Sequence, residues 1–198
     1  ATTWHTVATK DVSLLKRQMD IVNSLPKEYV FLNYLRCHDD IGWGLEYSWL
    51  KGRQMEEIPH KKFLNDFFTG NYPGSFAKGQ LYNDDKTSGD ARLCGTTASL
   101  CGLEKAVEDG QKEAVENAVR FDLTLHGYMF TLSGIPVIYS GDEIGQFNDY
   151  SYVNDPKKAA DSRYLHRGKF HWDAAGLRDK EGTVENILFY GLRRMESI

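Results

Sequence analysis

The spacing of apolar residues predicts three amphipathic helices. In residues 11–25 apolar side chains recur every three or four positions, Asp11 is placed to cap the first turn, and Pro26 ends the pattern. Residues 112–133 carry the longest pattern of this kind, and residues 184–198 carry the last. We therefore expect helices near both ends of the chain and one long helix between them.

Two short apolar runs predict buried strands, and acidic residues follow each run. Residues 29–35, YVFLNYL, are β-branched or aromatic and apolar on both faces, which is typical of a strand in a parallel sheet covered by helices. Residues 137–141, VIYSG, form a second run. His-Asp-Asp at 38–40 follows the first run, and Asp-Glu at 142–143 follows the second. Polar residues thus gather at the carboxyl ends of the strands.

Residues 41–112 differ in composition from the segments on either side, and this difference predicts an inserted subdomain. We expect a short helix at 61–68, where aromatic side chains cluster, and another at 92–108 with Gly110 as its stop. Between them, residues 69–92 are rich in Gly, Asn and Asp, so turns dominate there. A stretch of this length that carries its own helices indicates a mostly helical subdomain.

Helices and strands alternate along the chain, and a long polar loop at 144–183 follows the second strand. This order predicts an α/β fold whose site lies on the loops after the strands. Two strands cannot close a barrel of eight, so the chain is either a small open fold or about the last quarter of a TIM barrel. We favour the barrel portion, because the long loops need a rim from which to project.

Composition and charge exclude several classes of protein. The 198 residues have a formal net charge of −4, which is not basic enough to indicate a nucleic-acid partner. No apolar run approaches the ~20 residues of a membrane span, and the first residues show no signal-peptide pattern. Cys37, Cys94 and Cys101 fit no metal-ligand spacing. We expect free thiols, no metal, and a reducing compartment such as the cytoplasm.

Two stretches resemble motifs of the α-amylase superfamily, glycoside hydrolase family 13. Residues 33–43, NYLRCHDDIGW, resemble the motif after the seventh barrel strand of that family. Residues 133–145, SGIPVIYSGDEIG, are similar to its segment running into and past the eighth strand. The resemblance covers essentially all of residues 1–198. It implies the C-terminal portion of a (β/α)8 barrel, from about helix six to helix eight, with the subdomain at 41–112 inserted after strand seven.

Within this family the chain is most similar to the amylosucrases and sucrose hydrolases. His-Asp-Asp-Ile-Gly-Trp at 38–43 stands where most α-amylases have Asn-His-Asp. Four other stretches resemble the same branch: WHTVATKDVSLLK, NYPGSFAKG, TSGDARLCGT and DSRYLHR. The resemblance implies a parent enzyme that cleaves an α-glucosidic bond of sucrose or a small α-glucoside with retention. The glucosyl unit would pass to water or to an acceptor sugar, and no cofactor is required.

The resemblance implies roles for six residues. Asp39 matches the third carboxylate of the family's site, which stabilises the oxocarbenium-like transition state, and His38 matches a histidine that binds the same sugar. Arg163 matches an arginine that pairs with an upstream Asp and closes a pocket for one terminal glucosyl unit. Three residues would lie near the leaving or accepting sugar: Asp40, Arg92 and Lys78.

The residues themselves leave other interpretations open. His38 and Asp39 could pair with each other, Asp40 could cap a turn, and the arginines could lie on the surface. Lys78 stands where the branch usually has arginine, and an ammonium cannot offer the planar fork of a guanidinium. Among the aromatic residues, Trp43 and Trp49 could stack on sugar rings, although we favour packing within the subdomain.

The two residues that break the bond in that family are absent from the sequence. Its nucleophile motif, Gly-Phe-Arg-x-Asp-Ala, does not occur, and no strand-end Glu suits the acid/base role. We reject Asp142 and Glu143, because adjacent residues at a strand end point in different directions. We therefore expect the chain alone to be inactive, and its exposed barrel edges to favour self-association.

Two alternative functions stay open. One is hydrolysis of α-glucans, as in ordinary α-amylases, against which the amylosucrase-like subdomain argues. The other is a non-catalytic amylase-like protein, such as the heavy chains of amino-acid transporters, in which catalytic motifs are often lost.

Overall fold

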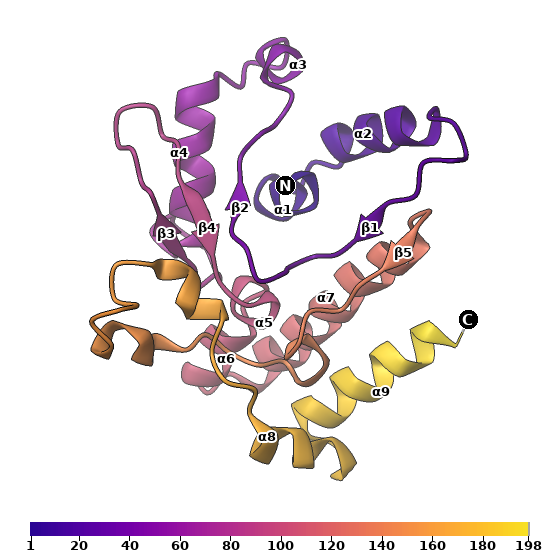
Figure 1. The fold of residues 1–198 in the computed structure, drawn as a ribbon, viewed down its shortest axis with the longest axis vertical. Coiled ribbons are helices and arrows are strands. Elements are labelled where there is room, and N and C mark those ends of the chain that lie inside the picture. The colour runs from indigo at the N-terminus through magenta and orange to yellow at the C-terminus, as the bar shows by residue number, and fades with distance from the viewer. Residues whose placement is uncertain (198) are drawn as a thin grey trace.

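The computed structural model describes residues 1–197 and shows a mixed helix-and-strand protein with two small sheets (Figure 1). One sheet pairs β1 (Leu32–Asn33) with β5 (Ile135–Pro136) in parallel. In the other, β4 (Arg92–Cys94) lies between β2 (Ile41–Gly42) and β3 (Gln80–Tyr82) and is antiparallel to both.

Helices and 3-10 turns connect these strands. The helices are α1 (Thr2–Thr9), α2 (Ser13–Asn23), α3 (Tyr47–Lys51), α4 (Glu57–Phe68), α5 (Thr97–Leu100), α6 (Leu103–Glu108), α7 (Lys112–Thr131), α8 (Trp172–Gly176) and α9 (Val184–Glu196). The 3-10 turns are η1 (Asp142–Ile144), η2 (Tyr150–Asn154), η3 (Ser162–His166) and η4 (Leu177–Asp179). The long loop after β5 therefore carries short helical turns throughout.

Four of the predicted helices are confirmed. The patterns at 11–25, 112–133 and 184–198 correspond to α2, α7 and α9, and the pattern at 61–68 makes up the last two thirds of α4; residue 198 lies outside the described residues. The N-cap residue of α2 is Val12, so Asp11, the predicted cap, lies one position before it. Its carboxylate still accepts a hydrogen bond from the Ser13 N–H at 2.8 Å, so it satisfies one of the free donors of the first turn.

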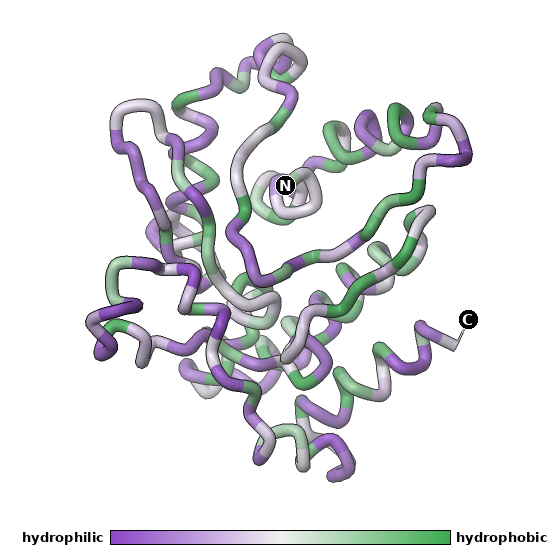
Figure 2. Tube along the Cα trace, viewed as in Figure 1, coloured by the Kyte–Doolittle hydropathy of each residue, from purple (hydrophilic) through white to green (hydrophobic). Residues whose placement is uncertain are grey.

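A parallel pair of strands is present, as the prediction of a parallel sheet expects, but the predicted strand at 137–141 and the predicted burial of both runs are wrong. β1 contains only two residues, and β5 begins at Ile135, before the predicted run at 137–141. Val30 is 65% exposed and Leu32 is 64% exposed. Each strand has one neighbour in this sheet, and Figure 2 shows the run through β1, between α2 and β5 in this view, as largely hydrophobic. Burial depends on neighbouring elements, and a local pattern cannot report whether they are present.

Gly134 allows β5 to approach β1 closely. Its φ is +128°, a backbone conformation that L side chains rarely adopt. A Cβ there would lie 2.3 Å from the Phe31 carbonyl oxygen. That same oxygen accepts a hydrogen bond from the Ile135 N–H at 2.8 Å, the first of the sheet. A larger residue at 134 would push the two strands apart.

The predicted helix at 92–108 is wrong in its first third, which forms strand β4. The chain turns at Gly95, where a Cβ would meet the Leu100 side chain at 2.9 Å, and α5 and α6 follow. Thr96 caps α5 by accepting a hydrogen bond from the Ser99 N–H. Gly110, with φ +65°, ends the helical segment as predicted. Residues 41–112, predicted to be a mostly helical subdomain, thus contain a three-stranded sheet as well as helices.

An aromatic core joins α1 and α4 to the end of β1. Phe68 packs against Trp4, with ring centroids 5.8 Å apart, and against Trp43, at 5.6 Å. Trp43 is 3% exposed and donates its indole N–H to the Asn65 side chain at 2.8 Å. The Trp4 indole N–H donates to the Leu35 carbonyl at 3.0 Å. This geometry fits the packing interpretation of Trp43, and it fixes the chain just before the acidic cluster.

Two other features of the sequence have structural counterparts. All three cysteines are free thiols, as predicted, and Cys94 and Cys101 are buried. Within residues 1–197, none of the helices has the length and apolar character needed to cross a lipid bilayer.

Two buried histidines lie in contact between α1 and α4. The His5 and His60 ring centroids are 5.0 Å apart, and neither ring nitrogen of His5 has a hydrogen-bond partner among the described residues. Burial, and then the neighbouring His60, lower the pKa of His5 to about 4, although Asp11 acts in the opposite direction. Burial also lowers the pKa of His60. Both rings are therefore neutral in the folded protein at pH 7.

We predict that His5 makes the protein less stable in mild acid. The unfolded imidazole takes up a proton below pH 6.5 and the folded one only near pH 4, so the free energy of unfolding falls across that window. The contribution is up to about 3 kcal/mol. Urea unfolding at pH 7 and pH 4 measures it. His5→Leu should remove this part of the fall, whereas Phe63→Leu, beside His60, should lower stability equally at both pH values. An unchanged pH dependence in His5→Leu would contradict the account.

Candidate functional site

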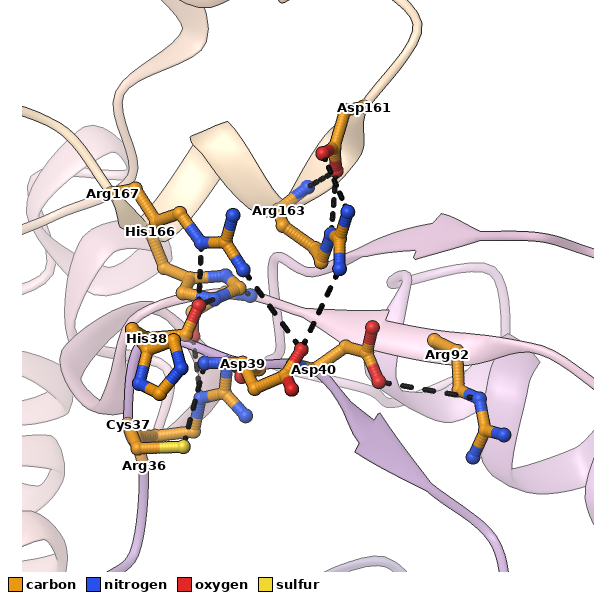
Figure 3. A network of polar contacts seen from close by, with 11 residues as sticks. Arg36, Cys37, His38, Asp39, Asp40, Arg92, Asp161, Arg163, His166 and Arg167 are labelled. Carbon is orange, nitrogen blue, oxygen red and sulfur yellow. Dashed lines mark hydrogen bonds and ion pairs between the residues drawn. The ribbon is translucent and has the colours of Figure 1, made fainter.

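The acidic cluster lies where the segment after β1 meets the long loop after β5 (Figure 3). Asp39 faces two arginines from that loop. Its Oδ1 lies 3.8 Å from a terminal guanidinium nitrogen of Arg163 and 3.8 Å from one of Arg167. The Asp39 side chain is 55% exposed, so a solute can reach it. The structure thus brings together two sequence-predicted residues, Asp39 and Arg163, that are far apart along the chain.

Asp161 orients Arg163. The Asp161 carboxylate accepts two hydrogen bonds from the guanidinium fork, both at 2.8 Å, and a third from the Arg163 backbone N–H at 3.0 Å. The guanidinium also lies 4.6 Å from the Tyr82 ring centroid, a favourable cation–π contact. A bidentate pair fixes the plane of the arginine. In this structure the fork is therefore held by a carboxylate of the same loop.

The pKa values of the two adjacent carboxyl groups, Asp39 and Asp40, are shifted in opposite directions. The Asp40 N–H donates to Asp39 Oδ1 at 3.0 Å, and this bond lowers the pKa of Asp39, with smaller contributions from Arg163 and other cations. Burial, and then the charge of Asp39, raise the pKa of Asp40. Arg92 lies 4.0 Å from Asp40 and partly opposes this rise. Asp39 is the member of the pair that most readily holds a negative charge.

Not every predicted residue joins this cluster. Arg92 contacts Asp40 from β4, and the exposed His38 contributes its backbone carbonyl to the network. Lys78 belongs elsewhere: its ammonium pairs with Glu104 at 2.9 Å and with Glu108. The two carboxylates belong to α6, so the ammonium of Lys78 is paired there and makes no contact with Asp39 among the described ion pairs.

Four residues of the cluster were missed by sequence reasoning. Asp161 and Arg167 stand within the DSRYLHR stretch, whose resemblance pointed only to Arg163. His166 lies in the same stretch, and Arg36 lies within NYLRCHDD. His166 and Arg36 are 4% and 2% exposed. Their flanking motifs were a usable signal, but no local rule indicates that a particular arginine or histidine turns inward.

The acidic residues after β5 have a structural role. Glu143 accepts a hydrogen bond from the Gly141 N–H at 2.7 Å. Asp142 is buried, 3.7 Å from Nε2 of His126, whose Nδ1 lies 2.8 Å from Asp122. Burial opposes the charge on His126, but the two carboxylates outweigh it and raise its pKa to about 10. A charged imidazolium thus ties α7 to the turn after β5.

Neither a comparison with protein families nor a search for metal-binding groups assigns a function to this cluster. No protein-family model matches this chain. Residues 1–197 hold no group of three or more His, Cys, Asp or Glu side chains arranged to bind a metal ion. The side chains that the cluster presents are carboxylates and guanidinium groups. Together they offer hydrogen-bond acceptors and donors at one accessible surface.

We predict that His126→Leu lowers the free energy of unfolding by about 3–5 kcal/mol at pH 7, because two buried carboxylates lose their counter-charge. The pKa of His126 is raised in the folded state, so its contribution is complete below pH 6.5 and is lost as the pH rises through about 10. Urea unfolding of both proteins from pH 6.5 to pH 10 measures the difference, which should shrink with rising pH. A difference that stays constant would rule out the charged form.

Proposed function

We propose that this chain is the C-terminal portion of the (β/α)8 catalytic barrel of a family 13 glycoside hydrolase of the amylosucrase type. The observation that carries the proposal is the approach of Arg163 to Asp39, 3.8 Å apart, from the two loops that follow parallel neighbouring strands. The resemblance to the family implies that the loops after strands seven and eight bring Asp39 and Arg163 together. In the proposal, β1 and β5 are these two strands and α7 is the helix that crosses between them.

The exposed faces of β1 and β5 support the barrel assignment. Parallel strands with apolar residues on both faces are found where helices and further strands cover them. Here Leu32 is 64% exposed and Ile135 is 53% exposed. Further strands of a barrel, alongside β1 and β5, would bury these side chains. The three-stranded sheet β2–β4–β3 and helix α4 form the proposed insertion after strand seven.

In this proposal Asp39 stabilises a positively charged transition state. Cleavage of an α-glucosidic bond develops positive charge on the ring, and a carboxylate close to it binds the transition state more tightly than the substrate. The lowered pKa of Asp39 keeps that carboxylate charged. Arg163 and Arg167 carry donors for sugar hydroxyls, and Asp40 and Arg92 stand where a leaving or accepting sugar would lie. Nucleophile and acid/base carboxyls would come from other strands of the barrel, and the substrate would be sucrose or a small α-glucoside.

The fold offers a reason to prefer small substrates over long glucans. Arg163 is held in one plane by Asp161 and leans over Tyr82. This arginine and its carboxylate stand beside Asp39, where they can close one end of a pocket for a single glucosyl unit. A mid-chain glucan needs a cleft open at both ends, so this arrangement favours the sucrose-type proposal over an ordinary α-amylase.

For the enzyme that contains this chain, we predict that Asp39→Asn lowers kcat on sucrose by about 10³-fold, because an amide cannot balance the developing charge. Released glucose and fructose measure the rate, and circular dichroism checks the fold. Asp173→Asn, an exposed aspartate of α8, is the matched control and should keep the parent rate. A rate for Asp39→Asn within a few-fold of the parent would remove Asp39 from the site.

A further inference from the structure

One residue at the end of β4 is linked to the acidic cluster through both of its backbone polar groups. The Gly95 N–H donates to Nδ1 of His166 at 3.2 Å, and the Gly95 carbonyl accepts from Nε of Arg36 at 2.9 Å. Both side chains are almost completely buried. They are therefore anchored in the core at Gly95, the residue that directly follows strand β4.

The other ends of the same two side chains hold two consecutive carbonyls of the cluster. Nε2 of His166 lies 3.2 Å from the His38 carbonyl oxygen, and a terminal nitrogen of Arg36 donates to the Asp39 carbonyl at 2.9 Å. Gly95 is thus bridged twice to the His38–Asp39 backbone. We call these two connections, through His166 and through Arg36, the double bridge.

The double bridge requires one protonation state of His166. Because Nδ1 accepts from a backbone N–H, Nε2 must carry the ring proton and donate to His38. Burial, and then the charge of Arg36, lower the pKa of His166 to about 3, with Arg167 acting in the same direction and the His38 carbonyl and Asp39 opposing. The neutral ring is therefore the form present near pH 7.

The double bridge restricts the direction in which the Asp39 side chain leaves the backbone. The Asp39 side chain is more than half exposed and lies 3.8 Å from both arginines, too far for a direct hydrogen bond. Two fixed carbonyls, on either side of its Cα, instead restrict the backbone dihedrals that set its Cα–Cβ direction. Arg167 adds a third constraint by donating to the His38 carbonyl.

We propose that His166 and Arg36 are positioning residues that hold the Asp39 carboxylate against Arg163 from an anchor at Gly95. The proposal rests on the proposed function only for its consequence, the correct placing of Asp39 against a sugar. It couples the sheet β2–β4–β3 to the segment after β1, because Gly95 directly follows β4 and Asp39 lies between β1 and β2. A shift of that sheet would turn Asp39 away from its arginine.

The bridge itself is tested by NMR on the isotope-labelled chain at pH 7. We expect a through-hydrogen-bond coupling between the Gly95 amide nitrogen and Nδ1 of His166, with the nitrogen shift of an unprotonated Nδ1. A protonated Nδ1 without this coupling would overturn the proposal. This measurement needs no variant and no sugar.

The positioning role is tested by the titration of Asp39, followed through its carboxyl carbon. His166→Asn keeps an acceptor for Gly95, and His166→Gln keeps a donor for His38, but neither spans both. Each should raise the apparent titration midpoint of Asp39, because the carboxylate leaves its arginine and the Asp40 N–H. Since neutral His166 carries no charge, a direct electrostatic effect cannot produce this shift. Gly95 amide exchange should quicken by roughly tenfold in His166→Gln.

Controls separate this proposal from the proposed function. His171→Asn changes an exposed histidine outside the double bridge and should leave the Asp39 midpoint unchanged. If Gly95 amide exchange quickens in His166→Gln but the titration midpoint of Asp39 stays unchanged in both His166 variants, His166 has a structural role only. That result would overturn the proposal. A shifted midpoint in a protein that binds no sucrose would uphold the double bridge and contradict the proposed function instead.

Discussion

The parallel pairing of β1 with β5 is the constraint on which the site depends. The Ile135 N–H donates to the Phe31 carbonyl and the Val137 N–H to the Asn33 carbonyl, both at 2.8 Å. Because the strands run in the same direction, the segments that follow them leave from the same edge. One segment carries Asp39 and the other leads to Arg163. The connection between the two strands contains the sheet β2–β4–β3 and ends in the long helix α7, which leads into β5.

The pairing alone leaves both segments free to move, and buried polar contacts remove that freedom. Trp4 donates to the Leu35 carbonyl, and the double bridge holds the carbonyls of His38 and Asp39. The imidazolium of His126 ties the turn after β5 to α7. Each of these groups is costly to bury without its partner. Replacing one member of any of these buried pairs therefore leaves its partner unsatisfied and destabilises the backbone around Asp39. The Asp39 side chain itself stays accessible to solvent.

Sequence patterns predicted what local physics determines. Apolar periodicity located α2, α7 and α9, because the pattern that predicts an amphipathic helix lies entirely within the residues of that helix. It failed at 92–108, where Leu93, Leu100 and Leu103 fit a helical face but Gly95 breaks the chain into a strand and a tight turn. It also failed to predict the exposure of Leu32, because burial is set by neighbours and not by composition.

The candidate site was predictable in part. Asp39 and Arg163 were named because their flanking motifs resemble a family, and the structure brings them together. Arg36 and His166 could not be named, because their partners are backbone atoms of Gly95, distant in sequence and invisible to any motif. Lys78 was named from its neighbours, but Glu104 and Glu108 hold it elsewhere. Motifs thus identify the groups that face a ligand better than those that hold them in place.

The central claim is that Asp39 and Arg163 form one end of a pocket for an α-glucosyl unit. Titration of the isotope-labelled chain with sucrose, beside a parallel titration with lactose, tests it most directly. We expect saturable shifts of the Asp39 carboxyl and the Arg163 guanidinium signals with sucrose, which carries an α-glucosyl group, and much weaker shifts with lactose, which carries a β-galactosyl group. Signals that respond to neither sugar, or equally to both, would contradict the account.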